Sequence, residues 1–134
     1  MTDFKILSAV MCEDARRDEN GQYFLVGIIG AGYLNSRSFP TTKKNLKAYV
    51  LGETSSAVLK LEFKLKGRSS TEALVQGEIG FERQDGQDRS MMKVDFDIDF
   101  GGTSFPGPDE YLFQLKNESG RWKTAASFDY VHQK

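Results

Sequence analysis

Residues 93–100, KVDFDIDF, alternate apolar and acidic side chains without a break. Successive side chains of a β-strand point to opposite faces, so a strand at this position separates the two kinds completely. The apolar set is Val94, Phe96, Ile98 and Phe100, and the acidic set is Asp95, Asp97 and Asp99. We expect the apolar set to face the core and the acidic set to face water, as in a half-buried strand.

The same period of two recurs along the chain. Residues 58–67, VLKLEFKLKG, place leucine and phenylalanine on one face and lysine and glutamate on the other. No helix-length segment shows the 3.6-residue period of an amphipathic helix. Turn-forming residues separate about eight such segments, as in sandwiches and barrels. The sequence therefore predicts an all-β fold, a single antiparallel β-sandwich of about eight strands, immunoglobulin-like or related, with residues 1–134 forming one domain.

Two further strand assignments concern the ends of the chain. Residues 4–13 and 22–29 are apolar on both faces, which is typical of central strands covered on both sides. The pair Asn20-Gly21 between them favours a turn with positive φ, so we expect the two segments to form a hairpin. In the last strand five residues are expected to share one side: Trp122, Thr124, Ala126, Phe128 and Tyr130.

Composition excludes several classes of partner. The chain has 18 Lys and Arg residues against 19 Asp and Glu, so it lacks the positive field that holds a phosphate backbone, and we expect no nucleic-acid partner. No stretch approaches the roughly 20 apolar residues of a membrane span, and the N-terminus lacks the pattern of a secretory signal. The single cysteine, Cys12, is typical of a reducing compartment. We therefore expect a cytoplasmic protein without a membrane partner.

The aspartates Asp95, Asp97 and Asp99 are also a candidate metal site. Calcium needs about six to eight oxygen ligands, which a curled loop supplies and a straight strand does not. The calcium-loop motif fails as well, because Phe100 stands where the loop needs glycine and Pro106 where it needs glutamate. A magnesium site using two of the aspartates and a neighbouring strand remains the alternative function, that of a metal-dependent binder or enzyme.

Pairing with lysines is the other role open to this acidic row. Lys60, Lys64 and Lys66 form a row on the polar face of residues 58–67. Three unpaired carboxylates on one strand repel each other, whereas a cross-strand ion pair stabilises a sheet by about 0.2–1 kcal/mol. We therefore expect the lysine row and the aspartate row to lie on the same sheet face.

No other motif predicts a catalytic or cofactor site. Residues 27–32, GIIGAG, lack the glycine order of a dinucleotide-binding turn, and no helix start follows them. The only histidine, His132, lies near the C-terminus, and Cys12 lies in an apolar strand, where an inert thiol is the expectation rather than a nucleophile paired with that histidine. One cysteine and one histidine cannot build a zinc site. We expect no cofactor and no enzymatic activity.

Two segments carry a resemblance to a known family. Residues 11–30, MCEDARRDENGQYFLVGIIG, resemble the opening of a family of uncharacterised bacterial and phage proteins, and residues 105–115 are similar to its later segment. The matching residues are Cys12, Glu13, Asp14, Arg16, Asn20, Gly21, Gly27, Phe105, Pro106, Gly107, Tyr111, Phe113 and Leu115. The resemblance implies a small β-sandwich domain of unknown function and a bacterial or phage origin. It implies no catalytic residue.

The absence of a catalytic constellation favours a non-enzymatic protein-binding or scaffolding module. We expect its partner to be a protein bound at an exposed strand edge or at two loops, residues 30–40 and 101–111, or a second copy of the chain paired at a sheet edge. The candidate anchors are four aromatic residues of these loops, Tyr33, Phe39, Phe105 and Tyr111. Ordinary packing in the core or at a corner is the alternative role for each. Inhibition of a host protein by a phage or mobile-element protein is one special case of this function.

Overall fold

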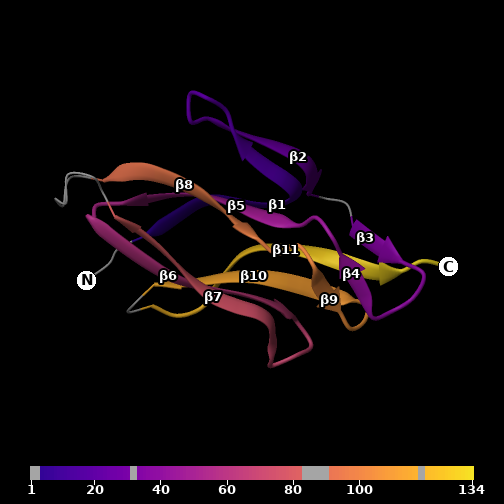
Figure 1. Cartoon of the computed structure of the whole chain (residues 1–134). Coiled ribbons are helices and arrows are strands. Elements are labelled where there is room, and N and C mark those ends of the chain that lie inside the picture. The colour runs from indigo at the N-terminus through magenta and orange to yellow at the C-terminus, as the bar shows by residue number, and fades with distance from the viewer. Residues whose placement is uncertain (1–3, 31–32, 83–90, 118–119) are drawn as a thin grey trace.

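The computed structural model of the chain describes residues 4–30, 33–82, 91–117 and 120–134. In these residues it contains 11 strands and no helix, arranged as two main sheets and one short ribbon. The sheets are mostly antiparallel and consistent with a β-sandwich, so the predicted all-β class is confirmed. Figure 1 shows the two sheets as stacked layers.

The first sheet has the order β2-β1-β5-β8. Its strands are β2 (Tyr23–Ile29), β1 (Lys5–Arg17), β5 (Lys47–Thr54) and β8 (Met92–Asp99). The second sheet has the order β3-β11-β10-β6-β7. Its strands are β3 (Tyr33–Ser36), β11 (Lys123–His132), β10 (Asp109–Asn117), β6 (Val58–Gly67) and β7 (Ala73–Glu82). β3 runs parallel to β11, and the other pairings are antiparallel.

The core lies between the two sheets and follows the predicted alternation. Phe96, Ile98 and Phe100 are 3%, 6% and 2% exposed, which confirms that the apolar face of residues 93–100 points inward. From the second sheet, the Phe113 ring meets that of Phe100 edge to face at a centroid distance of 5.7 Å. Such aromatic contacts add about 0.5–1.5 kcal/mol to the burial of the rings themselves.

Three short strands account for the difference between the eight predicted and the 11 observed in the described residues. They are β3, β4 (Thr41–Lys43) and β9 (Thr103–Phe105), and the last two pair to form the ribbon. Strands of three or four residues are too short to show a period, so the sequence predicted only connections there. The eight predicted segments match the eight longer strands.

A β-bulge in β11 changes which of its residues face the core. Phe113 pairs with Ala126 and Gln114 with Thr124, so Ala125 has no residue opposite it on β10. Thr124 consequently joins the outer face, where its Oγ1 accepts a hydrogen bond from Gln114 Nε2 at 3.2 Å. Phe128 is buried on the inner face. The expectation that Thr124 and Phe128 share one side is therefore wrong, because alternation alone does not reveal an inserted residue.

The corner before β10 is closed by Tyr111, whose hydroxyl donates a hydrogen bond to the backbone oxygen of Gly107. The ring of Tyr111 meets that of Phe105 at 4.7 Å and 74°. Phe105 in turn contacts Phe128 and Tyr130. These four rings form an aromatic cluster that joins the ribbon to the second sheet.

Candidate protein-binding arm

The arm is the part of the β1–β2 hairpin beyond Cys12, residues 13–27. β1 pairs with β5 only as far as Cys12, but its pairing with β2 continues to Arg17. The turn end of the arm therefore leaves the plane of the sheet and lies above β5 and β8 (Figure 1). Gly21, with a φ of 80°, forms the turn and confirms the predicted Asn20-Gly21 hairpin.

Gly27 is the second glycine on which the arm depends. Its φ is 67°, in the left-handed region that side chains with a Cβ rarely adopt. A Cβ placed there would lie 2.9 Å from Cγ of Glu13 on the paired strand. The close approach of β1 and β2 at this point thus requires glycine.

The acidic row of β8 holds the arm in place. The hydroxyl of Tyr23 donates a hydrogen bond of 2.5 Å to Asp97 Oδ1, and Arg17 Nη2 donates one of 2.9 Å to the backbone oxygen of Asp95. Tyr49, on β5 beneath the arm, donates to Asp95 Oδ2 at 2.9 Å. The Tyr23 and Tyr49 rings meet edge to face with centroids 5.0 Å apart.

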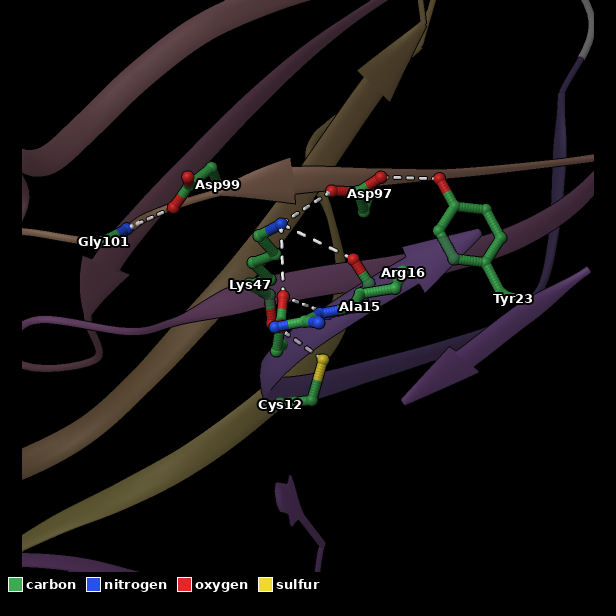
Figure 2. Close-up of polar contacts among 9 residues, drawn as sticks. Cys12, Ala15, Arg16, Tyr23, Lys47, Asp97, Asp99 and Gly101 are labelled. Atoms are coloured by element: carbon green, nitrogen blue, oxygen red, sulfur yellow. Dashed lines mark hydrogen bonds and ion pairs between the residues drawn. The ribbon is translucent and has the colours of Figure 1, made fainter. Parts of the chain in front are cut away.

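Lys47 occupies the centre of this polar cluster (Figure 2). Its Nζ lies 3.4 Å from Asp14 Oδ1 and 3.7 Å from Asp97 Oδ2, and it donates a 3.5 Å hydrogen bond to the backbone oxygen of Ala15. Burial lowers the pKa of Lys47, but Asp14 and Asp97, together with Asp99, outweigh it and raise that pKa above its ordinary value. A charged lysine therefore ties the arm, through Asp14 and Ala15, to β8 through Asp97.

We call the contacts of Arg17, Tyr23, Lys47, Asp95 and Asp97 the polar clamp. The third aspartate, Asp99, does not contact the arm and instead accepts a hydrogen bond from the backbone N–H of Gly101 at 2.7 Å (Figure 2). The clamp gives two of the three aspartates direct partners on the arm. The acidic row is therefore a structural attachment for the hairpin.

The predicted partnership of aspartate and lysine rows is wrong. The row Lys60, Lys64 and Lys66 lies on β6 of the second sheet, whereas the aspartates lie on β8 of the first. Lys60 pairs instead with Glu78 of β7, with a 3.6 Å separation. Alternation identifies the wet face of a strand but carries no information about which sheet the strand joins.

Two tyrosines at the clamp and the neighbouring thiol have pKa values raised above their ordinary values. Burial and the hydrogen bond to Asp97 raise the pKa of Tyr23 to about 12, and burial and Asp95 raise that of Tyr49 to about 12. Burial, reinforced by Asp14, also raises the pKa of the Cys12 thiol, which donates to the Lys47 backbone oxygen at 3.6 Å. Within the described ranges, no group of three or more His, Cys, Asp or Glu side chains is arranged to hold a metal ion.

The outward-facing side chains of β2 are apolar. Phe24, Val26 and Ile28 alternate along β2, share one face and are 51%, 52% and 59% exposed. β2 is an edge strand, and its seven residues include no charged side chain. By contrast, the edge strand β8 carries a lysine and three aspartates, β7 carries two glutamates, and β3 has only four residues.

The four aromatic residues proposed as anchors from the sequence do not form one surface. Tyr33 is 62% exposed on β3, and Phe39 is half-buried against the rings of Tyr130 and His132. Phe105 and Tyr111 are 0% and 2% exposed, so the core role that the sequence left open for them is the one they have. Residues 31–32 of the first predicted loop lie outside the described residues.

Sequence reasoning missed Phe24, Val26 and Ile28. Residues 22–29 were expected to form a central strand because they are apolar on both faces, but β2 lies at the edge of its sheet. The usable signal was the absence of charge from residues 20–30, directly after a highly charged hairpin loop. An uncharged strand is ordinary in a sheet centre and notable at an edge, and single-sequence patterns do not distinguish the two positions.

Comparison with known proteins adds a family to this description. Along the described part of the chain, no helix is long and apolar enough to cross a membrane. None of the curated proteins compared with the chain matches it. A family model does match residues 7–128, a range that includes both segments on which the resemblance was based. The chain therefore belongs to DUF6941, a family of unknown function, and the predicted resemblance to an uncharacterised family is confirmed.

Proposed function

We propose that this protein is a non-enzymatic binding module that pairs the edge of β2 with an extended segment of a partner protein. The observation that carries the proposal is a seven-residue edge strand without charge whose outward side chains Phe24, Val26 and Ile28 are all at least half exposed. An open edge presents unpaired backbone N–H and C=O groups that a further strand can satisfy. Strand addition of this kind takes affinity from the backbone and specificity from alternate side chains.

The chemistry of the partner follows from that of β2. Its segment would carry apolar residues at alternate positions, since aromatic and β-branched side chains pair well across strands with Phe24, Val26 and Ile28. Long charged side chains at those positions would lose hydration without gaining a countercharge on β2. The proposed partner is therefore an apolar, extended segment and not an acidic or basic tail.

The polar clamp supports the proposal from beneath the arm. Two-stranded hairpins are marginally stable alone, and here Tyr23, Lys47 and Asp97 attach the hairpin to the first sheet. A binding strand held in its bound conformation loses less entropy on association. The clamp therefore presents β2 as a rigid edge while its outward side chains Phe24, Val26 and Ile28 stay at least half exposed.

Site-specific photo-cross-linking in the organism of origin tests this function. A benzoylphenylalanine at position 24 should give one discrete adduct, which Val26→Lys abolishes because an edge lysine opposes strand addition. The matched control carries the same probe at Val58, a 56% exposed apolar residue of β6 in the second sheet. The partner identified at position 24 should then form a complex with the purified wild-type protein and not with the Val26→Lys variant.

Two results would count against this function. If positions 24 and 58 gave the same adducts, or if Val26→Lys left the adduct unchanged, β2 would not be the binding edge. An adduct of two copies of the chain would mean that β2 is a binding edge but that it pairs with a second copy of this protein and not with a separate partner.

The finer classification of the fold is part of the same proposal. We infer an immunoglobulin-like sandwich, supported by the parallel pairing of β3 with β11 and by the Tyr111–Gly107 hydrogen bond at the start of β10. A tyrosine that closes the corner before a late strand in this way is a hallmark of that architecture. Because one such fold hosts many unrelated functions, this classification is separate from the binding proposal.

A cytoplasmic location and the inhibition of a host protein stay predictions within this proposal. The first is supported by a single buried thiol, Cys12, among the described residues. The second is consistent with a small protein that offers an edge strand to another chain. The identity of the cross-linked partner decides the second.

A further inference from the structure

A second surface lies at the opposite end of β1, where both sheets have bare edges. β2 pairs with β1 only from Met11 to Arg17, and β3 pairs with β11 only from Asp129 to His132. The first halves of β1 and β11 therefore have no outer neighbour among the described strands. Between them lies a hollow of about 440 Å³, within the range of roughly 300–1,000 Å³ typical of ligand pockets.

The floor of this hollow is apolar and comes from both sheets. Ile6 of β1 and Phe4, directly before that strand, lie on one side, and the second sheet supplies Leu61, Leu115 and Ala125. Leu61 and Leu115 are 1% and 3% exposed, so the hollow reaches down to the core. A ligand with an apolar tail would find five hydrophobic side chains there.

Among the described residues, every charged side chain on the rim is positive. Lys5, Lys116, Arg121 and Lys123 line the hollow, and no carboxylate residue lines it within the described ranges. Lys116 pairs with Glu62 at 3.4 Å, whereas the other three make no ion pair with a described residue. This gathering of cations stands out in a chain whose net charge is −1.

The β11 bulge brings one of these cations to the hollow. With Ala125 inserted, Lys123 pairs with Leu115, whose side chain is buried on the inner side of β10. Lys123 consequently points along the inner side of its strand, at the open end of the sandwich. Without the extra residue, the alternation would place Lys123 on the outer face. The bulge is therefore what turns this cation toward the hollow.

The neighbouring surface reinforces the positive field. The Nζ atoms of Lys64 and Lys116 lie 4.1 Å and 5.3 Å from the centre of the Trp122 ring. Burial, together with the charges of Lys66 and Lys116, lowers the pKa of Lys64, as expected where cations are close and anions few. An anion entering the hollow would relieve part of this repulsion.

We propose that the hollow binds a small amphipathic carboxylate. Its apolar chain lies against Leu61, Leu115 and Ala125, and its carboxylate lies between Arg121 and Lys123 on the rim. Burial of the apolar chain contributes to the affinity, and the two cations select a charged head over a neutral one. This site is independent of the arm, so it stands or falls separately from the proposed function.

Titration of the purified protein with decanoate, followed by calorimetry and thermal unfolding, tests the proposal. Decanoate should bind with one-to-one stoichiometry and raise the Tm by about 3–6 °C at ten times its Kd. Acetate has the charge without the tail and decanol has the tail without the charge, so neither should bind comparably. The variant Arg121→Gln/Lys123→Gln should weaken decanoate binding about five- to tenfold, since two partly exposed charge pairs are lost.

The matched control is Lys44→Gln/Lys93→Gln, which removes two exposed lysines outside the hollow and should leave the Kd unchanged. A second variant, Ala125→Phe, fills the floor without changing the charge and should abolish binding. Circular dichroism confirms that each variant is folded. The proposal is overturned by absence of saturable binding, by decanol binding as tightly as decanoate, or by equal losses in the rim variant and its lysine control.

Discussion

Tyr23 shows how a single side chain joins the arm to the sheet beneath it. Its hydroxyl donates to Asp97, and the guanidinium carbon of Arg17 lies 4.3 Å from the centre of its ring. In the unfolded chain a tyrosine ionises near pH 10, but in the folded protein burial and Asp97 raise the pKa of Tyr23 to about 12. Folding therefore holds this phenol in its protonated form.

This shift predicts how stability depends on pH. A group whose pKa is raised by folding contributes stability below its unfolded pKa and loses that contribution as the pH rises through the folded value. We expect the free energy of unfolding to fall between about pH 10 and pH 12, with Tyr23 contributing about 1–2 kcal/mol of the loss. Urea unfolding of the wild type and of Tyr23→Phe at pH 8, 10 and 11.5 measures this contribution of Tyr23. A variant with the same decrease as wild type would contradict this role for Tyr23.

The candidate anchors make a second prediction at this scale. Phe105→Ala should lower the free energy of unfolding by about 3–5 kcal/mol, because Phe105 is 0% exposed and contacts three other rings. Tyr33→Ala, at a residue that is 62% exposed, should change it by about 0.5 kcal/mol or less. Chemical denaturation of the two variants provides the comparison. Equal losses would show that the aromatic cluster around Phe105 is not the core described above.

In residues 93–100, alternation predicted which side chains face the core, but it did not predict what the other side chains contact. Alternation at residues 93–100 correctly placed Phe96, Ile98 and Phe100 inside. The partners of Asp95 and Asp97 all lie more than 40 positions away along the chain: Arg17, Tyr23, Lys47 and Tyr49. The periodicity of one segment carries no information about contacts with distant segments. Neither the clamp nor the placement of the aspartate and lysine rows on different sheets could therefore be predicted.

At the scale of elements, the β1–β2 hairpin was predictable as a pair of strands and not as an arm. The Asn20-Gly21 turn and two apolar segments were sufficient for the pairing. The departure of β1 from β5 after Cys12 depends on what packs beneath it, namely Tyr49, Lys47 and the aspartates of β8. The exposure of β2 follows from that departure. The only sign of it in the sequence of β2 is the absence of charged residues.

Gly27 tests whether the pairing within the arm is as close as described. Gly27→Ala should lower the free energy of unfolding by about 1–3 kcal/mol, because its φ is 67° and the new Cβ would meet Glu13 at 2.9 Å. Gly30→Ala is the matched control, since its nearest neighbour would be 3.8 Å away and its φ is not in the left-handed region. The two variants are compared by thermal unfolding. Tolerance of alanine at both positions would argue against the close β1–β2 approach.

At the scale of the whole molecule, the two proposed surfaces divide β1 between them. Its second half carries the arm, where β2 offers an apolar edge, and its first half borders the cationic hollow. Neither surface could be predicted from composition, because a net charge of −1 says nothing about where the charges lie. Acidic residues gather on β8, whereas basic residues gather beside β11. Only the pairing of strands far apart in sequence brings each set together.

The separation of the surfaces makes their tests independent. Val26→Lys alters the edge of β2 and should leave decanoate binding unchanged, whereas Arg121→Gln/Lys123→Gln should leave the cross-link from position 24 unchanged. Val26 is 52% exposed, so we expect the lysine variant to keep its stability within about 0.5 kcal/mol. Binding differences between these variants can then be assigned to the surface and not to unfolding.

Hydrogen exchange of the β2 amides, in the free protein and in its complex with the cross-linked partner, tests the central claim most directly. Strand addition forms new backbone hydrogen bonds along the open edge, so exchange should slow by about tenfold or more at alternate amides of residues 23–29. The amides of the edge strand β7 in the second sheet serve as the internal reference and should not change. Unchanged exchange along β2 in a complex shown to be intact would contradict the account.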